Sequence, residues 1–185
     1  MILMRHGQSE FNVVYSVTRV DPGIRDPALT VEGRRQARAA AEALGGAGLQ
    51  RVLASPYRRA LQTAAIIAET LGLPVTVDPI VGERAAFACD VGSPVSDLRR
   101  EWPDLRLDHL PESWWPSMEE SHDSLLVRCA RFRDRALADA ERHALLVVSH
   151  WGFIRGLTGQ RITNATWLRY DPVSTMPLVE PWVDP

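Results

Sequence analysis

Short runs of consecutive apolar residues recur along the chain, and polar or turn-forming residues bound each of them. The runs are too short for helices and are typical of strands that are buried on both faces. They predict strands at residues 1–4, 51–55, 75–77 and 144–148, and a possible edge strand at residues 166–170.

Between these runs, apolar residues recur at helical spacing, which predicts helices that alternate with the strands. Thr30 is suited to cap a helix that Gly45 stops, and Pro56 fits the first turn of a second helix that Gly72 closes. Three further helices are expected, at residues 95–102, 122–140 and 153–157.

This alternation predicts the α/β class, with three layers in which helices cover both faces of a mostly parallel central sheet. With 185 residues, the chain is long enough for one well-buried domain, which we expect to span residues 1–185. The residues after Asn12 are predicted to form a loop. Prolines and glycines break residues 78–120 into short pieces, so this stretch is predicted to be a lid or a substrate-specificity region.

Composition narrows the possible functions. Hydrophobic residues make up 45% of the chain and charged residues 24%, which is ordinary for a globular protein, and a net charge of −2 indicates no nucleic-acid partner. All 21 basic residues are arginine, which excludes a Walker-type phosphate loop and a Schiff-base lysine. No signal peptide, membrane-spanning run or metal-ligand spacing is visible, so we expect a cytoplasmic protein without a membrane partner or a metal.

Arginine, histidine and serine residues follow three of the predicted strands. Arg5-His6 follows the first, Ser55 and then Arg58-Arg59 follow the second, and Ser149-His150 follows the strand before the last helix. Because parallel strands bring their carboxyl ends to one edge of the sheet, these imidazoles and guanidiniums should converge. Arginine forks, helix N-termini and a nucleophilic imidazole nitrogen together suit a phosphate group.

The motifs around these residues resemble those of the histidine phosphatase superfamily, the phosphoglycerate-mutase-like proteins. Residues 5–12 resemble its R-H-G-x-S-x-x-N signature, and residues 26–37 resemble its D-x-x-L-T-x-x-G-x-x-Q-A helix start. Residues 55–64 match its S-P-x-x-R-A-x-Q-T-A segment, and residues 149–152 match S-H-x-G. Asp78-Pro79 before Glu83 resembles the approach to the family's acid. The matches occur in the family's order.

The resemblance implies a role for each matched residue. His6 would be the nucleophile that takes the phosphoryl group as phosphohistidine, and Glu83 would protonate the leaving oxygen and then activate water. Arg5, Arg59 and His150 would hold the equatorial phosphate oxygens. Glu83 must then be protonated for one step and ionised for the next, so we expect its pKa to lie above that of a free carboxylate.

Further residues are expected to border the substrate. Trp151 stands where the family commonly has glycine, and it would narrow the pocket. The expected substrate-binding residues are Asn12, Gly7, Ser9, Arg84 and Trp151. His109, His122 and the Trp114-Trp115 loop are predicted to be structural or exposed, with a place at the pocket rim as the alternative.

Departures from the family pattern favour a phosphatase over a mutase. Residues 83–87 lack the E-R-H-Y-G continuation that marks the bisphosphoglycerate-dependent mutases, and their basic insertion is not recognisable. The predicted function is therefore metal-independent hydrolysis of a small phosphorylated substrate, without a cofactor. The alternatives are a mutase-type phosphotransferase and a phosphate-binding module that has lost turnover.

Overall fold

The computed structural model describes residues 1–173. Within them, five strands form one sheet in the order β3-β2-β4-β1-β5. The first four strands in chain order pair in parallel, and only β5 is antiparallel, at the edge beside β1. The strands are β1 (Ile2–Arg5), β2 (Arg51–Ala54), β3 (Val75–Val77), β4 (Leu145–Ser149) and β5 (Trp167–Arg169). The prediction of a mostly parallel α/β sheet is confirmed.

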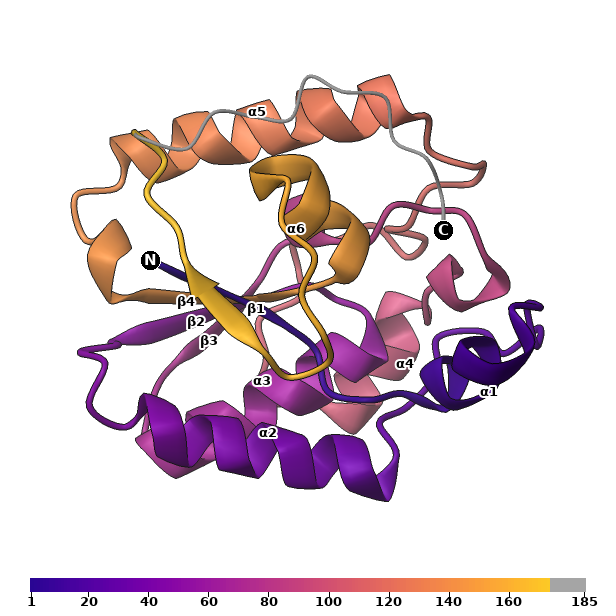
Figure 1. Cartoon of the computed structure of the whole chain (residues 1–185), viewed down its shortest axis with the longest axis horizontal. Helices are drawn as coiled ribbons and strands as arrows, with labels where there is room; N and C mark the ends of the chain where they lie inside the picture. Colours follow the sequence, from indigo (N-terminus) through magenta and orange to yellow (C-terminus); the bar gives the residue numbers. More distant parts are fainter. Residues whose placement is uncertain (174–185) are drawn as a thin grey trace.

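Helices cover both faces of this sheet (Figure 1). In that view α5 and α6 lie above the sheet, α2 and α3 lie below it, and α1 lies at the right. Over residues 1–173 the α-helices are α1 (Glu10–Thr18), α2 (Val31–Leu44), α3 (Arg58–Leu71), α4 (Val95–Glu101), α5 (His122–Ala138) and α6 (Trp151–Thr158). Short 3-10 helices occur at η1 (Pro79–Val81), η2 (Ala88–Asp90) and η3 (Arg142–Ala144).

Alternate residues of the central strands enter two separate hydrophobic clusters. Ile2 and Met4 of β1 pack in the cluster with α2 and α3, whereas Leu3 packs in the cluster with α5 and α6. Because both faces are covered, a continuous apolar run with no polar alternation is what such a strand requires. None of the helices within residues 1–173 has the length and apolar character needed to cross a membrane.

Helix α1 corrects one prediction, since the residues after Asn12 were expected to form a loop. Phe11 is the buried residue of α1 and stacks on Tyr15, but the same helix also exposes Val13 and Val17, so its apolar residues do not form one clear helical stripe in the sequence. A capping box starts it instead: the Ser9 backbone N–H donates to Asn12 Oδ1 (3.0 Å), and the Asn12 N–H donates to Ser9 Oγ (3.4 Å). Local capping therefore forms this helix without extensive burial.

Several helix ends also differ from expectation, among them the start of α6 at Trp151 rather than at residue 153. Helix α3 begins at Arg58 with Tyr57 as its N-cap, so Pro56 lies before the first turn rather than in it. The Asp26 carboxylate accepts a hydrogen bond from the Arg58 N–H (2.9 Å), which satisfies a donor at this helix start from outside the helix. Helix α5 ends at Ala138, before the Ala140 that its apolar spacing had included.

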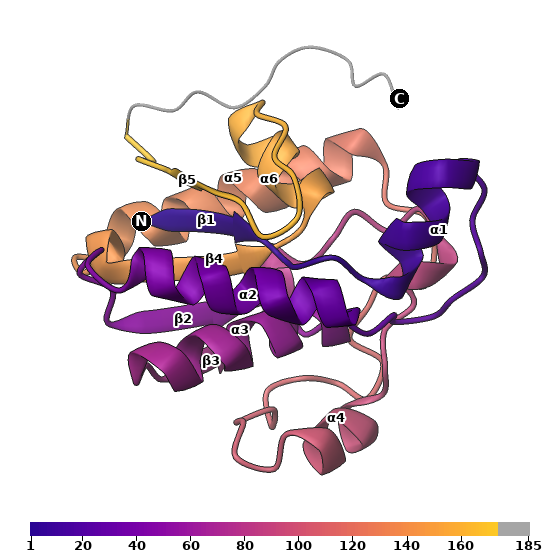
Figure 2. The ribbon, with the colours of Figure 1, turned by 60° about the horizontal axis from the view of Figure 1, so that its bottom comes forward.

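The carboxyl ends of the parallel strands point to the same side of the molecule, toward α1 at the right of Figure 1. In Figure 2, α4 and its flanking loops project at the bottom, and α1 again lies at the right-hand end. Strand β4 lies between β2 and β1, so residues that follow these three strands become neighbours. The predicted site is assembled at this edge.

Candidate active site

Two buried histidines lie next to each other at the carboxyl ends of the neighbouring strands β1 and β4. His6 follows β1, and its backbone N–H donates to the Ser149 carbonyl (2.9 Å), which continues the parallel ladder. His150 follows β4 and is the N-cap of α6. Their ring centroids are 5.1 Å apart, at an interplanar angle of 59°. The topology thus joins residues that are 144 positions apart in the chain.

Hydrogen bonding fixes which nitrogen of His6 carries the proton. His6 Nδ1 lies 2.7 Å from the Gly7 carbonyl oxygen, which can only accept, so Nδ1 is protonated and Nε2 keeps its lone pair. Burial lowers the pKa of His6 well below its ordinary value, and the charges of Arg59 and Arg5 lower it further. The imidazole is therefore neutral at neutral pH, as a nucleophile must be.

His150 has one ring nitrogen engaged and one unengaged. His150 Nε2 lies 2.8 Å from Ser55 Oγ, and its Nδ1 is buried without a hydrogen-bond partner within residues 1–173. Burial lowers the pKa of His150 well below its ordinary value, and the positive charge of Arg59 lowers it further. A buried polar atom without a partner is unfavourable, and it marks a place where a polar ligand atom would be stabilised.

Two arginines bring positive charge to the imidazoles. Arg59, in the first turn of α3, is almost fully buried; its Nη1 donates to the Cys89 carbonyl (2.7 Å) and its Nη2 to Asp90 Oδ1 (3.0 Å). Arg5 donates from Nη1 to the Ile162 carbonyl (3.2 Å), whereas its buried Nε has no partner among the described residues. Burial lowers the pKa of Arg5 to about 10, so it remains a cation at neutral pH.

Glu83 brings a carboxyl group to the start of α6. Its Oε1 accepts from the Arg84 backbone N–H (2.9 Å), and a Cβ atom at Gly152 would overlap this oxygen. Glycine at position 152 is therefore required for the carboxyl group to occupy this place, two residues after His150. Burial, followed by the charge of Asp90, raises the pKa of Glu83 to about 7. This direction agrees with the expectation from the sequence.

The structure gives Asn12, Ser9 and Gly7 contacts within the chain. Asn12 and Ser9 form the capping box of α1 described above. Gly7, an expected substrate-binding residue, lies close to the chain itself, because a Cβ atom at Gly7 would overlap the Gly33 carbonyl oxygen. Contact of these three residues with a substrate stays a prediction.

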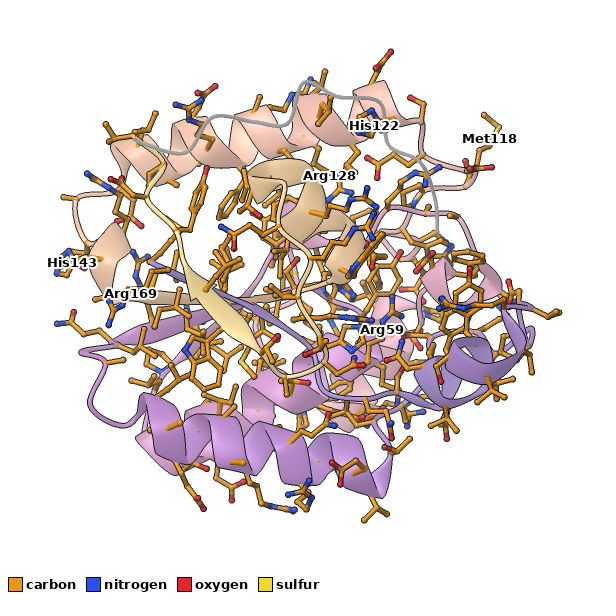
Figure 3. The ribbon with its side chains drawn as sticks, in the orientation of Figure 1. Arg59, Met118, His122, Arg128, His143 and Arg169 are labelled. Carbon is orange, nitrogen blue, oxygen red and sulfur yellow. The ribbon has the colours of Figure 1, made fainter. Side chains whose placement is uncertain are left out.

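The remaining candidates have contacts within the chain that the sequence did not reveal. Arg84 donates from Nε to the Glu120 carbonyl (3.0 Å) and from Nη2 to Glu119 (2.9 Å). Trp151 is half-buried, with the Arg155 guanidinium over its ring at 5.0 Å. His109 Nε2 lies 2.8 Å from the Val77 carbonyl oxygen, which it can meet only as a donor, in agreement with a structural role. Figure 3 shows His122 at the start of α5.

Trp114 belongs to an aromatic stack that ends at His150. Its ring packs edge-on against Tyr57 (4.7 Å between centroids), and Tyr57 packs edge-on against His150 (5.1 Å). Trp114 is buried and donates from Nε1 to the Ser93 carbonyl (2.9 Å). Trp114 therefore has a packing role, because it supports Tyr57, which in turn contacts the His150 ring.

Sequence reasoning missed two residues that hold the site. Asp90 is buried beside Arg59, and its Oδ2 also accepts from the Ala86 and Phe87 backbone N–H groups (3.1 Å each). Asn164 Nδ2 donates to the His6 carbonyl (3.2 Å) and to Asn12 Oδ1 (3.0 Å). Asp90 is the last residue of the short helix η2 and Asn164 lies in a loop. Each is a single polar residue that no periodicity or spacing in the sequence marks as part of a site.

Comparison with known proteins agrees with this geometry. The family model of the histidine phosphatase superfamily (branch 1) matches residues 1–175. The chain belongs to the histidine phosphatase superfamily. The resemblance of the sequence motifs is thereby confirmed, and within residues 1–173 no group of three or more His, Cys, Asp or Glu side chains is arranged to hold a metal ion.

Several known proteins are similar to this chain in sequence. A bifunctional protein of Mycobacterium tuberculosis is 36% identical over 152 residues, which cover 81% of this chain and 40% of that protein. A probable phosphoglycerate mutase of Proteus mirabilis is 31% identical over 155 residues, covering 80% of this chain and 67% of that protein. The chain therefore spans less than half the length of the mycobacterial relative.

Phosphatases occur among the solved structures whose fold is similar to that of this chain. A mycobacterial glucosyl-3-phosphoglycerate phosphatase in complex with VO3 has a TM-score of 0.65 and 25% identity, and the match covers 98% of this chain and 97% of that one. The superfamily thus includes phosphatases and mutase-like relatives of this chain.

Proposed function

We propose that this histidine phosphatase hydrolyses phosphomonoesters through a phosphohistidine formed on His6. The observation that carries the proposal is the pair of neutral imidazoles, 5.1 Å apart between centroids, beside the guanidiniums of Arg5 and Arg59. A neutral nucleophile surrounded by fixed positive charge is the arrangement that phosphoryl transfer needs, because positioning and charge stabilisation supply most of its catalysis.

The first step transfers the phosphoryl group to the enzyme. His6 Nε2 would attack phosphorus while the bond from phosphorus to the ester oxygen breaks, and the leaving oxygen would take the proton of the Glu83 carboxyl. Arg59, Arg5 Nε and His150 Nδ1 would donate to the equatorial oxygens, and the latter two atoms lack a partner within residues 1–173. The product alcohol leaves with its proton.

The second step returns the enzyme to its starting state. The ionised Glu83 would take a proton from a water molecule as that water attacks the phosphohistidine, so the nitrogen–phosphorus bond breaks and inorganic phosphate is released. A carboxyl group whose pKa is about 7 is present in both forms near neutral pH. It can therefore serve as the acid in the first step and as the base in the second.

Hydrolysis rather than transfer to a second sugar or glycerate is favoured by the surroundings of Glu83. Arg84 is engaged with Glu119 and the Glu120 carbonyl, and residues 83–87 lack the continuation typical of the mutases. We further propose that one catalytic domain carries this activity and that residues 78–120 form its specificity region, since Cys89 and Asp90 there already hold Arg59. The probable phosphoglycerate mutase among its relatives supports a mutase as the second candidate.

The test is hydrolysis of p-nitrophenyl phosphate in the presence of EDTA. Wild-type protein should turn over and form an acid-labile, base-stable phosphoenzyme, and His6→Ala should lose both, by at least about 10²-fold in rate. A His6→Ala variant that keeps the wild-type rate would contradict the mechanism. Conversion of 3-phosphoglycerate to 2-phosphoglycerate with a bisphosphate primer would favour the mutase, and tight phosphate binding without product would favour the binding module.

A further inference from the structure

Side chains hold four consecutive backbone carbonyls just before and at Glu83. The carbonyls of residues 80, 82 and 83 accept hydrogen bonds from the Arg128 guanidinium, at 2.9, 2.8 and 3.2 Å. The Val81 carbonyl accepts from Ser149 Oγ at 2.7 Å. Within residues 1–173 this stretch pairs with no strand. Besides the hydrogen bonds of η1, these two side chains, from α5 and the end of β4, fix its backbone.

Arg128 uses all five of its N–H donors in this arrangement. Besides the three carbonyls, its Nε donates to Glu120 Oε1 (3.0 Å) and its Nη2 donates to Glu120 Oε2 (2.6 Å). Arg128 is 19% exposed and the Glu120 side chain 7%. Figure 3 shows Arg128 pointing from α5 into the interior of the molecule. A lysine could supply at most three donors and no planar fork, so this set of contacts requires arginine.

Glu120 also holds the chain on the other side of Glu83. Its backbone N–H donates to the Ala85 carbonyl (2.8 Å), and its own carbonyl accepts from Arg84 Nε (3.0 Å). The Glu83 segment is therefore fixed on both sides, from residue 80 to residue 85. The Arg128 guanidinium also lies 5.4 Å from the centroid of Phe153, on α6, the helix whose first turn contacts the Glu83 carboxyl.

We propose that Arg128, oriented by Glu120, is a positioning residue that holds the Glu83 carboxyl at the place from which it exchanges its proton with the substrate. This inference rests on the proposed role of Glu83 as the general acid and base. Without the guanidinium, three carbonyls lose their donors and the buried Glu120 carboxylate loses its cation, so the segment relaxes. A displacement of about 1 Å in a catalytic group can lower a rate by about 10²-fold.

The choice of leaving group separates positioning of the acid from general damage to the fold. β-Glycerophosphate releases an alkoxide that needs a proton, whereas p-nitrophenyl phosphate releases a phenolate that needs little help. In Arg128→Ala, kcat/KM for β-glycerophosphate should fall by about 10²-fold. For p-nitrophenyl phosphate it should fall much less. The matched control is Arg131→Ala, which removes an exposed arginine one turn further along α5.

Two further measurements connect Arg128 to Glu83. The fall in kcat/KM caused by Arg128→Ala should not add to the fall caused by Glu83→Gln when both changes are combined, because both disable the same proton transfer. A cavity of about 470 Å³ is lined by Arg128, Arg131, Glu120 and Ile80. Free guanidinium at millimolar concentration can therefore enter Arg128→Ala and should restore part of its β-glycerophosphate rate. Arg131→Ala should not respond to it.

Equal losses on both substrates, or a loss that adds fully to that of Glu83→Gln, would overturn the inference and leave Arg128 a structural residue. If the wild-type protein hydrolyses neither substrate, the proposed function fails, and backbone hydrogen exchange then judges Arg128 separately. Exchange of residues 80–85 should accelerate in Arg128→Ala and not in Arg131→Ala. Unchanged exchange would show that the guanidinium does not hold this segment.

Discussion

At the scale of single residues, the protonation of Glu83 depends on its surroundings more than on its own chemistry. A free glutamate is ionised at neutral pH, but burial and the neighbouring Asp90 charge raise this pKa to about 7. The contact with Gly152 keeps the carboxyl group in that environment. Two residues that are not adjacent to Glu83 in the sequence, Asp90 and Gly152, therefore help to decide whether this side chain can donate a proton.

The pH dependence of activity follows from this pKa. Glu83 must be protonated to assist an alkoxide leaving group, so kcat/KM for β-glycerophosphate should fall as pH rises through about 7, by about tenfold per unit above it. Steady-state kinetics from pH 5 to 9 would measure this. Glu83→Gln should be slower and should lack this limb. If kcat/KM of Glu83→Gln fell with the same midpoint, the pH dependence would belong to another group.

The pH dependence of stability provides a second test of the raised pKa of Glu83. Because the pKa of Glu83 is raised from 4.5 to about 7 on folding, the folded state holds the proton more tightly than the unfolded state. Its contribution to stability is fully present below pH 4.5 and is lost as pH rises through about 7. Glu83→Gln should therefore be more stable relative to wild type at pH 8 than at pH 4.

At the scale of elements, strands and helices differ in how well the sequence predicts them. Strand β1 was predictable because its apolar run matches a strand covered on both faces, and α3 because its apolar stripe faces the sheet. Helix α1 was not, because Phe11 is its buried residue and Val17 is 82% exposed. A short helix whose packed residues, Phe11 and Tyr15, alternate with exposed valines leaves little periodicity to detect.

The capping box makes α1 sensitive to one side chain. Ser9→Ala should lower the free energy of unfolding by about 0.5–2 kcal/mol, because the Asn12 N–H loses its acceptor at the helix start. Chemical denaturation would measure the change. Val17→Ala, in the same helix but exposed, is the control and should stay within about 0.5 kcal/mol of wild type. Equal effects of the two variants would contradict a capping role.

At the scale of the whole molecule, the sheet order explains how far the site could be predicted. His6, Ser55 and His150 were predictable as neighbours because each follows a strand of one parallel sheet, and the order β2-β4-β1 makes them adjacent. The partners of Arg59 and Glu83 were not predictable in this way. Asp90, which contacts Arg59, lies in η2, and Arg128, which contacts the Glu83 carbonyl, lies on α5. Such contacts depend on the packing of whole layers, which local patterns do not encode.

A site spread over several strands should couple anion binding to global stability. Vanadate at about 100 times its Kd should stabilise the protein by about 2.7 kcal/mol, which corresponds to a rise in Tm of about 5–10 °C. Thermal unfolding with increasing vanadate would measure it. His6→Ala should show a much smaller rise, whereas Arg131→Ala should keep the full rise. A full rise in His6→Ala would place the anion elsewhere.

The position of β1 in the sheet also has a consequence for biosynthesis. This strand, which leads directly into His6, hydrogen-bonds on one side to β4 and on the other to β5. Both partners lie beyond residue 144, so the ribosome makes the first strand of the sheet long before either neighbour exists. The nascent chain must carry an unpaired apolar strand until β4 and β5 emerge, and only then can the nucleophile reach its final place.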